Sequence, residues 1–175
     1  MSFTLKADTS GLTKYLRELG DAVEEAARPA AQAGAQVLYD EVKRNVNKIK
    51  RKTGNLASSI YQAYSKDNSG PGKATYHVSW NAKKAPHGHL VEFGHLQRYE
   101  YYKDEQGKVR PKVRPEMQGK PRPKRNRAAL DAYYVTLPAP KQVAARPFVR
   151  PAQAKMPQAI AAAEKVLFDR LKRKS

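Results

Sequence analysis

The chain has 175 residues, contains no cysteine, and carries 34 Lys and Arg against 16 Asp and Glu, which gives a formal net charge of +18 at pH 7. The lack of cysteine excludes disulfides and thiolate metal sites, and no apolar run approaches the roughly 20 residues that span a membrane. Because such a charge makes the molecule repel itself, it predicts an anionic partner, either nucleic acid or an acidic protein surface. The length fits one domain, residues 1–175, and we expect an intracellular, soluble protein without a membrane partner.

A long helix is predicted in the N-terminal part of the chain, over about residues 10–46, because apolar residues recur there at helical spacing. Pro29 lacks an N–H and disfavours helical geometry in the residue before it, so we expect a kink there or two helices. Ala30, Ala33 and Gly34 form a stripe of small residues that would let another element approach closely. The recurring apolar positions are Leu12, Leu16, Leu19, Val23, Ala30, Ala33, Val37, Leu38, Val42 and Val46.

A β-hairpin is predicted next. Residues 56–64 follow a Thr-Gly turn, and their pattern fits a helical turn that leads into a strand. In "ATYHVSW" the residues Tyr76, Val78 and Trp80 alternate with polar ones, as a half-buried strand requires. We therefore expect a hairpin built from residues near 59–66 and 74–81.

A basic, proline-rich arm is predicted over residues 97–127, inserted in the domain. Four prolines between residues 108 and 127 block helices and central strands, and the positive charges oppose collapse. We expect an extended loop that orders when it meets a partner; the alternative is a disordered insert without a role. The basic residues of the arm are Lys108, Arg110, Lys112, Arg114, Lys120, Arg122, Lys124, Arg125 and Arg127.

Tyrosines stand directly before this arm, at positions 99, 101 and 102. Lys and Arg neutralise phosphates and aromatic rings stack on exposed bases, so the combination favours nucleic-acid binding. The same arm would also fit an acidic groove of a neighbouring protein. No zinc finger, basic zipper or RNA-binding motif decides between the two.

The last part of the chain returns to regular structure. "DAYYVTLP", residues 131–138, is predicted to be a strand. An extended segment then leads into a terminal helix, with Pro157 suited to its first turn. One face of this helix carries Ile160, Ala163, Leu167 and Leu171.

A cluster of histidines in "PHGHLVEFGHLQRYE", residues 86–100, raises the question of a metal site. His87, His89, Glu92 and His95 are residue types that bind zinc and similar ions. However, neither a strand nor a helix presents all four on one face. A structural role is the favoured interpretation, and a metal-dependent hydrolase is the weaker alternative.

Catalytic motifs are not found in the sequence. There is no G-x-S-x-G, no phosphate-binding G-x-x-x-x-G-K and no dinucleotide-binding G-x-G-x-x-G. We therefore predict no catalytic residue, no cofactor and no metal ligand, and a protein that is not an enzyme.

Three motifs in chain order resemble those of a known family. A helix with a basic last turn is followed by T-G-x-L, then by V-E-F-G, and finally by R-P-F-x-x-P-A before the last helix. This order resembles the neck or tail-completion proteins of long-tailed bacteriophages, over roughly residues 25–94 and 144–172. The matching positions are Thr53, Gly54, Leu56, Val91, Glu92, Phe93, Gly94, Arg146, Pro147, Phe148 and Pro151.

The resemblance implies a fold and a role. The fold is α+β, with a long N-terminal helix and a C-terminal helix packed on a small, mostly antiparallel sheet. The role is that of a virion structural protein, assembled in the host cytoplasm, that forms a homo-oligomeric ring, expected to be sixfold, between the capsid connector and the tail tube. Its partners would be head-closure or connector, tail-terminator and tail-tube proteins, with DNA crossing the ring without specific contacts, and no catalytic residue or cofactor is implied.

Residues 95–143 are longer and more basic than the resemblance implies, so the role of the arm stays open. The alternative function is a sequence-non-specific nucleic-acid-binding protein. Within the V-E-F-G motif, Val91 and Phe93 are expected in the core, and Gly94 is expected to end the element. A buried Glu92 would need a partner, for which Arg146 is the candidate.

Overall fold

The computed structural model describes residues 10–49, 54–124 and 126–173. Backbone proximity divides the chain into two compact units. Unit 1 comprises Met1–Gly88 and Pro147–Ser175, and unit 2 comprises His89–Arg146. That residues 1–175 form one domain stays a prediction.

Unit 1 is built on α1 (Ser10–Lys48), a continuous helix of 39 residues that passes through Pro29. The chain therefore does not divide into two helices at Pro29. A proline inside a helix costs about 3 kcal/mol. Here Ala26 and Ala30, on either side of it, are both buried, so tertiary packing contributes to keeping the helix continuous.

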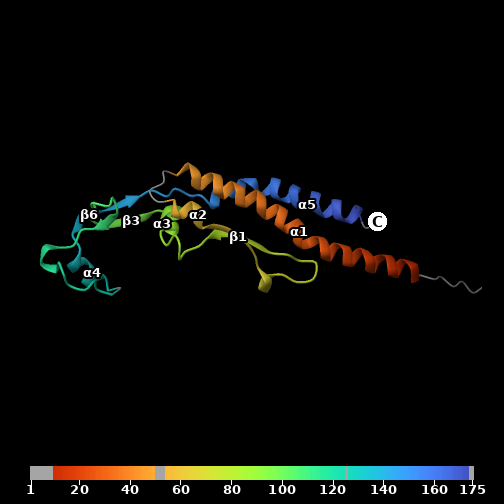
Figure 1. Cartoon of the computed structure of the whole chain (residues 1–175), viewed down its shortest axis with the longest axis horizontal. Helices are drawn as coiled ribbons and strands as arrows, with labels where there is room; N and C mark the ends of the chain where they lie inside the picture. Colours follow the sequence, from red (N-terminus) through yellow and green to blue (C-terminus); the bar gives the residue numbers. More distant parts are fainter. Residues whose placement is uncertain (1–9, 50–53, 125, 174–175) are drawn as a thin grey trace, which may run out of the picture. The chain divides into compact units, whose positions relative to one another are not determined.

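The second helix of unit 1, α5 (Met156–Lys172), lies along α1, with its C-terminal end toward the N-terminal half of α1 (Figure 1). The two helices approach closely at Gly34: a Cβ built there would lie 2.9 Å from the backbone oxygen of Ala159. The predicted close approach at the small-residue stripe is confirmed. In α5 the buried position is Ala159, whereas Ile160 of the predicted apolar face is exposed.

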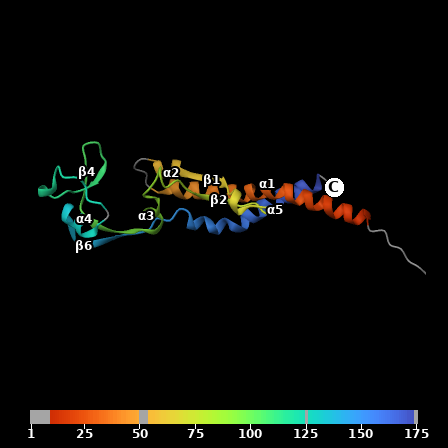
Figure 2. The same ribbon diagram turned by 90° about the horizontal axis from the view of Figure 1, so that it is seen from below.

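The predicted hairpin is present. The short helix α2 (Asn55–Ser59) leads directly into β1 (Ile60–Tyr64), which pairs antiparallel with β2 (Tyr76–Trp80). A 3-10 turn, η1 (Lys66–Asn68), lies between the strands. The hairpin runs beside α1 (Figures 1 and 2), where the Arg28 guanidinium lies 4.4 Å from the centre of the Tyr64 ring.

Phe148 lies in the core of unit 1. Its side chain is fully buried and packs edge-on against Trp80, with ring centres 5.5 Å apart. The Asn45 side-chain amide of α1 donates a hydrogen bond of 3.2 Å to the Phe148 carbonyl. A 3-10 turn, η3 (Arg150–Lys155), then leads into α5.

Unit 2 contains two antiparallel strand pairs. β3 (His95–Tyr99) follows α3 (Gly88–Phe93), whose first residue belongs to unit 1, and pairs with β6 (Thr136–Val143). β4 (Tyr101–Lys103) pairs with β5 (Val109–Pro111). A 3-10 turn, η2 (Pro115–Met117), and a helix, α4 (Arg127–Tyr133), lie between β5 and β6.

Two predictions about this region are wrong. The segment 97–127 is not a continuous extended arm, because its first half folds into the β4–β5 hairpin and η2. Backbone bonds fix this half: Lys112 N–H donates to Glu100 and Val135 N–H donates to Lys112, at 2.8 and 2.9 Å. The segment "DAYYVTLP" is not one strand either, because α4 extends to Tyr133, and the Asn126 side chain caps it by accepting from Ala128 N–H.

The α+β class is confirmed. The structure has a long N-terminal helix, a C-terminal helix and three two-stranded antiparallel sheets among the described residues. None of the helices in the described ranges is long and apolar enough to cross a membrane.

Candidate assembly surfaces

The described part of the T-G-x-L motif, residues 54–56, lies at the start of α2. Gly54 has a φ of +75°, a left-handed conformation that favours glycine, and its carbonyl accepts the Ser58 N–H at 3.1 Å. Leu56 is buried, so the motif anchors the start of the hairpin in the core of unit 1. Thr53 lies outside the described residues.

The V-E-F-G motif forms the end of α3 and the turn after it. Gly94 ends the helix with a φ of +74°, and a Cβ there would lie 2.6 Å from the Val143 carbonyl oxygen, so a side chain is excluded on two grounds. Glu92 is 1% exposed and Phe93 is 63% exposed. Phe93 is therefore not in the core, contrary to the prediction, and Val91 is half-buried. Consecutive helical residues point about 100° apart, and in this six-residue helix the carboxylate, not the ring, faces inward.

The predicted ion pair between Arg146 and Glu92 stays a prediction. The Glu92 residue is buried and the Arg146 residue is exposed. Arg146 contacts the motif through its backbone, whose N–H donates to the Val91 carbonyl at 2.8 Å. A backbone bond of this kind holds the segment in place without requiring arginine.

The R-P-F-x-x-P-A motif anchors the chain before α5. Phe148 and Ala152 are buried, whereas Pro147 and Pro151 are exposed. Pro151 falls at the start of η3, where a missing N–H costs no hydrogen bond. Phe148 and Ala152 of the motif therefore contribute to the core of unit 1, whereas its two prolines face solvent.

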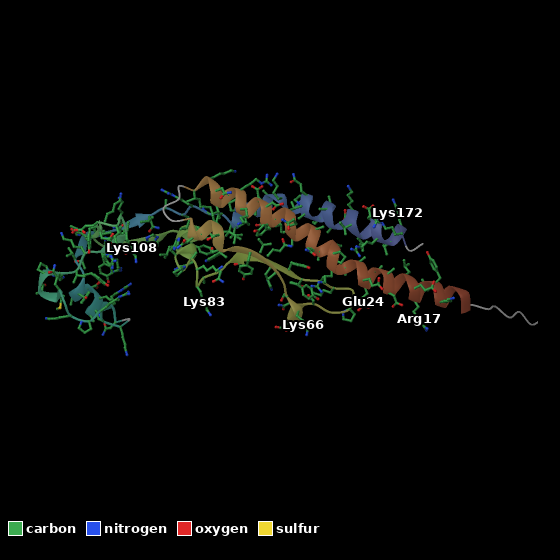
Figure 3. All side chains as sticks on the ribbon, in the orientation of Figure 1. Arg17, Glu24, Lys66, Lys83, Lys108 and Lys172 are labelled. Atoms are coloured by element: carbon green, nitrogen blue, oxygen red, sulfur yellow. The ribbon has the colours of Figure 1, made fainter. Side chains whose placement is uncertain are left out.

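The basic residues of the β4–β5 hairpin are partly paired. Arg110 Nε lies 2.7 Å from the Asp104 carboxylate, and Lys112 Nζ lies 3.2 Å from that of Glu100. The Arg110 hydrogen bond lowers the pKa of Asp104, and the same contact raises the pKa of Arg110. Lys108 lies in the turn of this hairpin and is exposed (Figure 3). Arg114 donates from Nε to the Tyr134 carbonyl at 3.2 Å, so its role is local.

The segment after η2 carries its charges without acidic neighbours in sequence. Residues 117–127 contain five Lys or Arg and no Asp or Glu. The described ones, Lys120, Arg122, Lys124 and Arg127, are all exposed, and Arg125 lies outside the described residues. This part of the predicted arm therefore carries exposed positive charge that has no acidic residue near it in the sequence.

A cluster of tyrosines connects α4 to the strands of unit 2. The Tyr99 hydroxyl donates to the Asp131 carboxylate at 2.8 Å, and the Tyr134 ring lies 5.3 Å from that of Tyr99 and 4.9 Å from that of Tyr133. Burial, followed by the bond to Asp131, raises the pKa of Tyr99. Of the three tyrosines for which the sequence favours base stacking, Tyr99 is thus occupied in holding unit 2 together.

A hollow of about 710 Å³ opens beside this cluster, between the hairpin and the turn after η2. Tyr101, Tyr102 and Tyr133 contribute aromatic walls, and Gly119 lines its edge. The Tyr133 hydroxyl donates to the Lys120 carbonyl at 2.9 Å, so the basic segment starts at the rim of the hollow. The tyrosines stand out in the sequence, but the hollow that they line depends on the β4–β5 hairpin, which the sequence analysis did not predict.

A second surface that was not predicted lies at the N-terminal end of α1. Tyr15, Leu16, Leu19 and Val23 are exposed, although their spacing continues the apolar face that is buried farther along the helix. The periodicity of the sequence identifies these apolar residues, but only the extent of α5 shows that this helix does not cover them.

The histidine cluster does not form a metal site among the described residues. His87 and His89 are exposed, and His95, in β3, is half-buried. Within the described ranges, no three His, Cys, Asp or Glu side chains are placed to hold a metal ion.

Comparison with known protein families gives one match. Residues 10–94 match the family described as "Bacteriophage HK97-gp10, putative tail-component". No curated protein and no solved structure matched the chain.

The match begins with α1 and ends at Gly94, immediately before β3. It includes the T-G-x-L and V-E-F-G motifs and leaves out R-P-F-x-x-P-A and the basic segment. Residues 10–94 are thus similar to a family of phage tail components, in agreement with the resemblance to phage neck and tail-completion proteins that the sequence motifs predicted.

Proposed function

We propose that the protein is a tail-completion or head–tail connector subunit of the phage neck. In this role copies of the chain form a ring, expected to be sixfold, that joins the capsid connector to the tail tube and lets DNA pass. The observation that carries the proposal is the family match over residues 10–94. The protein acts by assembly, without catalysis, inside a virion that forms in the host cytoplasm.

The surface of the chain supports an assembly role. Unit 1 exposes an apolar helical stripe at its end, and unit 2 exposes an aromatic hollow beside a basic segment. Exposed apolar surface of this kind is typical of a subunit that is buried in a complex. A net charge of +18 would also be relieved next to DNA or next to acidic neighbouring proteins. Head-closure, tail-terminator and tail-tube proteins are the proposed neighbours.

The test is a phage that lacks this gene, complemented with variants. We expect the deletion to yield filled heads and separate tails in electron micrographs, and the chain to be found in wild-type particles by mass spectrometry. Joined, infectious particles in the deletion strain would overturn the proposal.

The variant for this test should not remove residues 104–127, because that deletion would also remove β5 and its backbone bonds. Replacing Lys120, Arg122 and Lys124 by Gln removes the exposed charge and keeps the hairpin. We expect folded protein, shown by an unchanged circular dichroism spectrum, but a loss of joined particles. The matched control is the same change at Lys83, Lys84 and Lys165, three basic residues that are exposed on unit 1.

A sequence-non-specific nucleic-acid-binding protein is the second candidate. It is favoured by Tyr101 and Tyr102, which are exposed on a hairpin that also carries Arg110 and Lys112. It predicts a monomer whose affinity for DNA or RNA falls steeply with salt, with a log–log slope of about −0.7 to −0.9 per phosphate contacted. A salt-independent affinity, or no measurable affinity, would remove this candidate.

A further inference from the structure

A hollow of about 400 Å³ lies in unit 1, between α1 and the outer end of the β1–β2 hairpin. We call it the basic hollow. Side chains of both elements line it, among them Glu24, Arg28, Tyr64, Lys66 and Lys73. Figure 3 shows Lys66 at the outer end of the hairpin and Glu24 on the stretch of α1 beside it. The hollow is therefore formed inside one unit, by two elements that are distant in the sequence.

Three basic side chains meet at the basic hollow without an acidic partner. Arg28, Lys66 and Lys73 are exposed, and none of them forms an ion pair within the described ranges. Glu24 lines the same hollow, but among the described residues it forms no ion pair either. Like charges held close together repel each other unless an anion neutralises them. The arrangement therefore predicts an anionic ligand.

The Arg28 side chain is held in place by an aromatic ring. Its guanidinium carbon lies 4.4 Å from the centre of the Tyr64 ring, and that ring packs against Tyr76, with ring centres 5.5 Å apart. An arginine that stacks on an aromatic face keeps its N–H donors in the plane of the guanidinium, where they can reach a ligand at its edge. Arg28 is thus oriented before a ligand binds, so less side-chain entropy is lost on binding.

The loop between β1 and β2, which carries both lysines, is fixed by hydrogen bonds of its own. The Ser69 hydroxyl donates to the Ser65 carbonyl at 2.7 Å and accepts the Thr75 N–H at 2.9 Å. Gly70 and Lys73 exchange two backbone hydrogen bonds, each of 2.9 Å. The backbone that supports the lysines is therefore ordered, which lowers the entropy cost of binding in the same way as the stacking of the arginine.

The kinds of donor and their directions favour a phosphate over a carboxylate. A single arginine fork satisfies the two oxygens of a carboxylate, whereas a phosphate has further oxygens for lysines, which bind it as point charges. In the basic hollow the arginine comes from α1 and the lysines come from the hairpin. Three positive charges beside one negative charge also suit a group that carries about −1.5 to −2 at pH 7, as a phosphate monoester does.

We propose that the basic hollow binds a phosphate group, which the Arg28 fork and the amines of Lys66 and Lys73 hold together. Glu24 at the same hollow repels the group and limits its affinity. The phosphate comes either from a free phosphate or from the backbone of a nucleic acid. The proposal goes beyond the neck role and does not depend on it, because it uses residues of unit 1 alone.

The first measurement follows the amide chemical shifts of the full-length protein during a titration with inorganic phosphate. Ionic strength and pH are held constant, so general screening does not change. We expect saturable shifts in the amides of residues 24–28 and 64–75, and no such shifts with sodium acetate in a parallel titration. Shifts that do not saturate, or equal shifts with acetate, would overturn the proposal.

A second titration distinguishes the two sources of the group and uses a short DNA duplex. If the nucleic-acid backbone is the source, the duplex shifts the same amides and added inorganic phosphate reverses those shifts. If a free phosphate is the source, the duplex leaves these amides unchanged and inorganic phosphate alone shifts them. A short polyglutamate peptide that saturates the same amides at a lower concentration than either would assign the hollow to an acidic protein and overturn the proposal.

Removal of the two lysines tests the site against the net charge of the chain. Lys66→Gln with Lys73→Gln removes two charged donors and should weaken phosphate binding by about 10-fold or more. The control, Lys83→Gln with Lys84→Gln, removes the same charge from exposed lysines of unit 1 that do not line the hollow, and should bind like the wild type. Equal losses in the two variants would show that net charge alone attracts phosphate. Thermal melts of every variant check the fold.

Arg28→Lys tests the arginine without a change of charge. The variant loses the planar fork and its stacking on Tyr64, so phosphate binding should weaken by about 5-fold. Arg17→Lys is the control, since Arg17 is exposed on α1 and does not line the hollow. Wild-type affinity in Arg28→Lys would contradict the proposed role of the fork.

Glu24→Gln is expected to improve binding. The change removes a negative charge from the hollow and should tighten phosphate binding by about 3-fold, a gain that misfolding does not produce. Glu164→Gln makes the same change at an exposed position on α5 and should have no effect. If Glu24→Gln binds no more tightly than this control, the hollow is not the site. Failure of the phosphate site would leave the neck assignment standing, because that assignment is tested by the joining of heads and tails.

Discussion

Unit 1 and unit 2 are stabilised by different interactions. Unit 1 holds nearly all the buried apolar residues of the described chain, on α1, α5, the hairpin and the Phe148 segment. In unit 2, Tyr134 is the buried apolar residue within the described ranges, and the structure depends on tyrosine contacts, backbone ladders and exposed ion pairs. Hydrophobic burial is the dominant favourable contribution to folding, whereas exposed ion pairs contribute at most about 1 kcal/mol. Unit 2 is therefore expected to open more readily than unit 1 in hydrogen exchange.

The difference in packing between the two units corresponds to the extent of the family match. The family match covers most of the core-forming part of unit 1 and ends at Gly94, where the strands of unit 2 begin. A weakly stabilised, basic unit joined to a well-packed one is the arrangement expected when the second unit gains order from a partner.

The largest effect is expected from Phe148→Ala. Phe148 is fully buried against Trp80, so the change leaves a cavity and should lower the free energy of unfolding of unit 1 by about 3–5 kcal/mol. Phe168→Ala is the control, since Phe168 is 57% exposed and should change stability by about 0.5 kcal/mol or less. Denaturant unfolding followed by circular dichroism measures both. Equal effects would show that Phe148 is not a core residue of unit 1.

Replacing two glycines of α1 by alanine is expected to change the stability of unit 1 in opposite directions. A Cβ at Gly34 would lie 2.9 Å from the backbone oxygen of Ala159, whereas a Cβ at Gly20 meets nothing within 4 Å. Gly34→Ala should therefore push α1 and α5 apart and destabilise unit 1 by about 1 kcal/mol. Gly20→Ala should stabilise it by about 0.5–1 kcal/mol through helix propensity. Urea midpoints test the pair, and a stabilising Gly34→Ala would contradict the close helix contact.

A smaller effect, confined to unit 2, is expected from Tyr99→Phe. The change removes the hydrogen bond to Asp131 and should cost about 0.5–1 kcal/mol. Because the folded pKa of Tyr99 is raised above 10.0, its contribution is present below pH 10.0 and is lost as the pH rises through the folded pKa. Hydrogen exchange of β3 and α4 against pH measures this, with the amides of α1 as the internal control. A wild-type unit 2 that gains stability above pH 10.0 would contradict the assignment.

The smallest effect is expected from Asp104→Asn, which removes the exposed pair with Arg110. The pKa of Asp104 is lowered from 3.8, so the contribution of the pair is present above pH 3.8 and fades as the pH falls through the folded pKa. We expect a slight loss of order in the β4–β5 hairpin at pH 7, visible as a change in the amide chemical shifts of that hairpin alone. Glu105→Gln is the matched control, since Glu105 is exposed in the same turn. Larger shifts for the control would show that the pair does not hold the turn.

Short-range patterns in the sequence predicted much of unit 1. The period of α1, the helical turn that leads into β1, and the stripe at Gly34 follow from spacing and side-chain size, which act within a few residues. The continuity of α1 at Pro29 did not follow, because the local cost of the proline is outweighed by packing against elements far away in the chain. In unit 2 the prolines and charges of residues 108–127 indicated an extended arm, but backbone bonds to residues 100 and 133–135 fold its first half.

The candidate surfaces divide in the same way. Residue types and their spacing were enough to predict the strong positive charge, the α+β class, the family motifs and the positions of the basic residues. The burial of Glu92, the exposure of Phe93, the backbone contact between Arg146 and Val91, and the end of α1 that α5 does not cover follow from the fold. Charge and periodicity are properties of residues near one another in the chain. Burial, in contrast, depends on which segments far apart in the chain meet in the fold. The basic arm could therefore be predicted from the sequence, whereas the exposed end of α1 and the tyrosine-lined hollow of unit 2 could not.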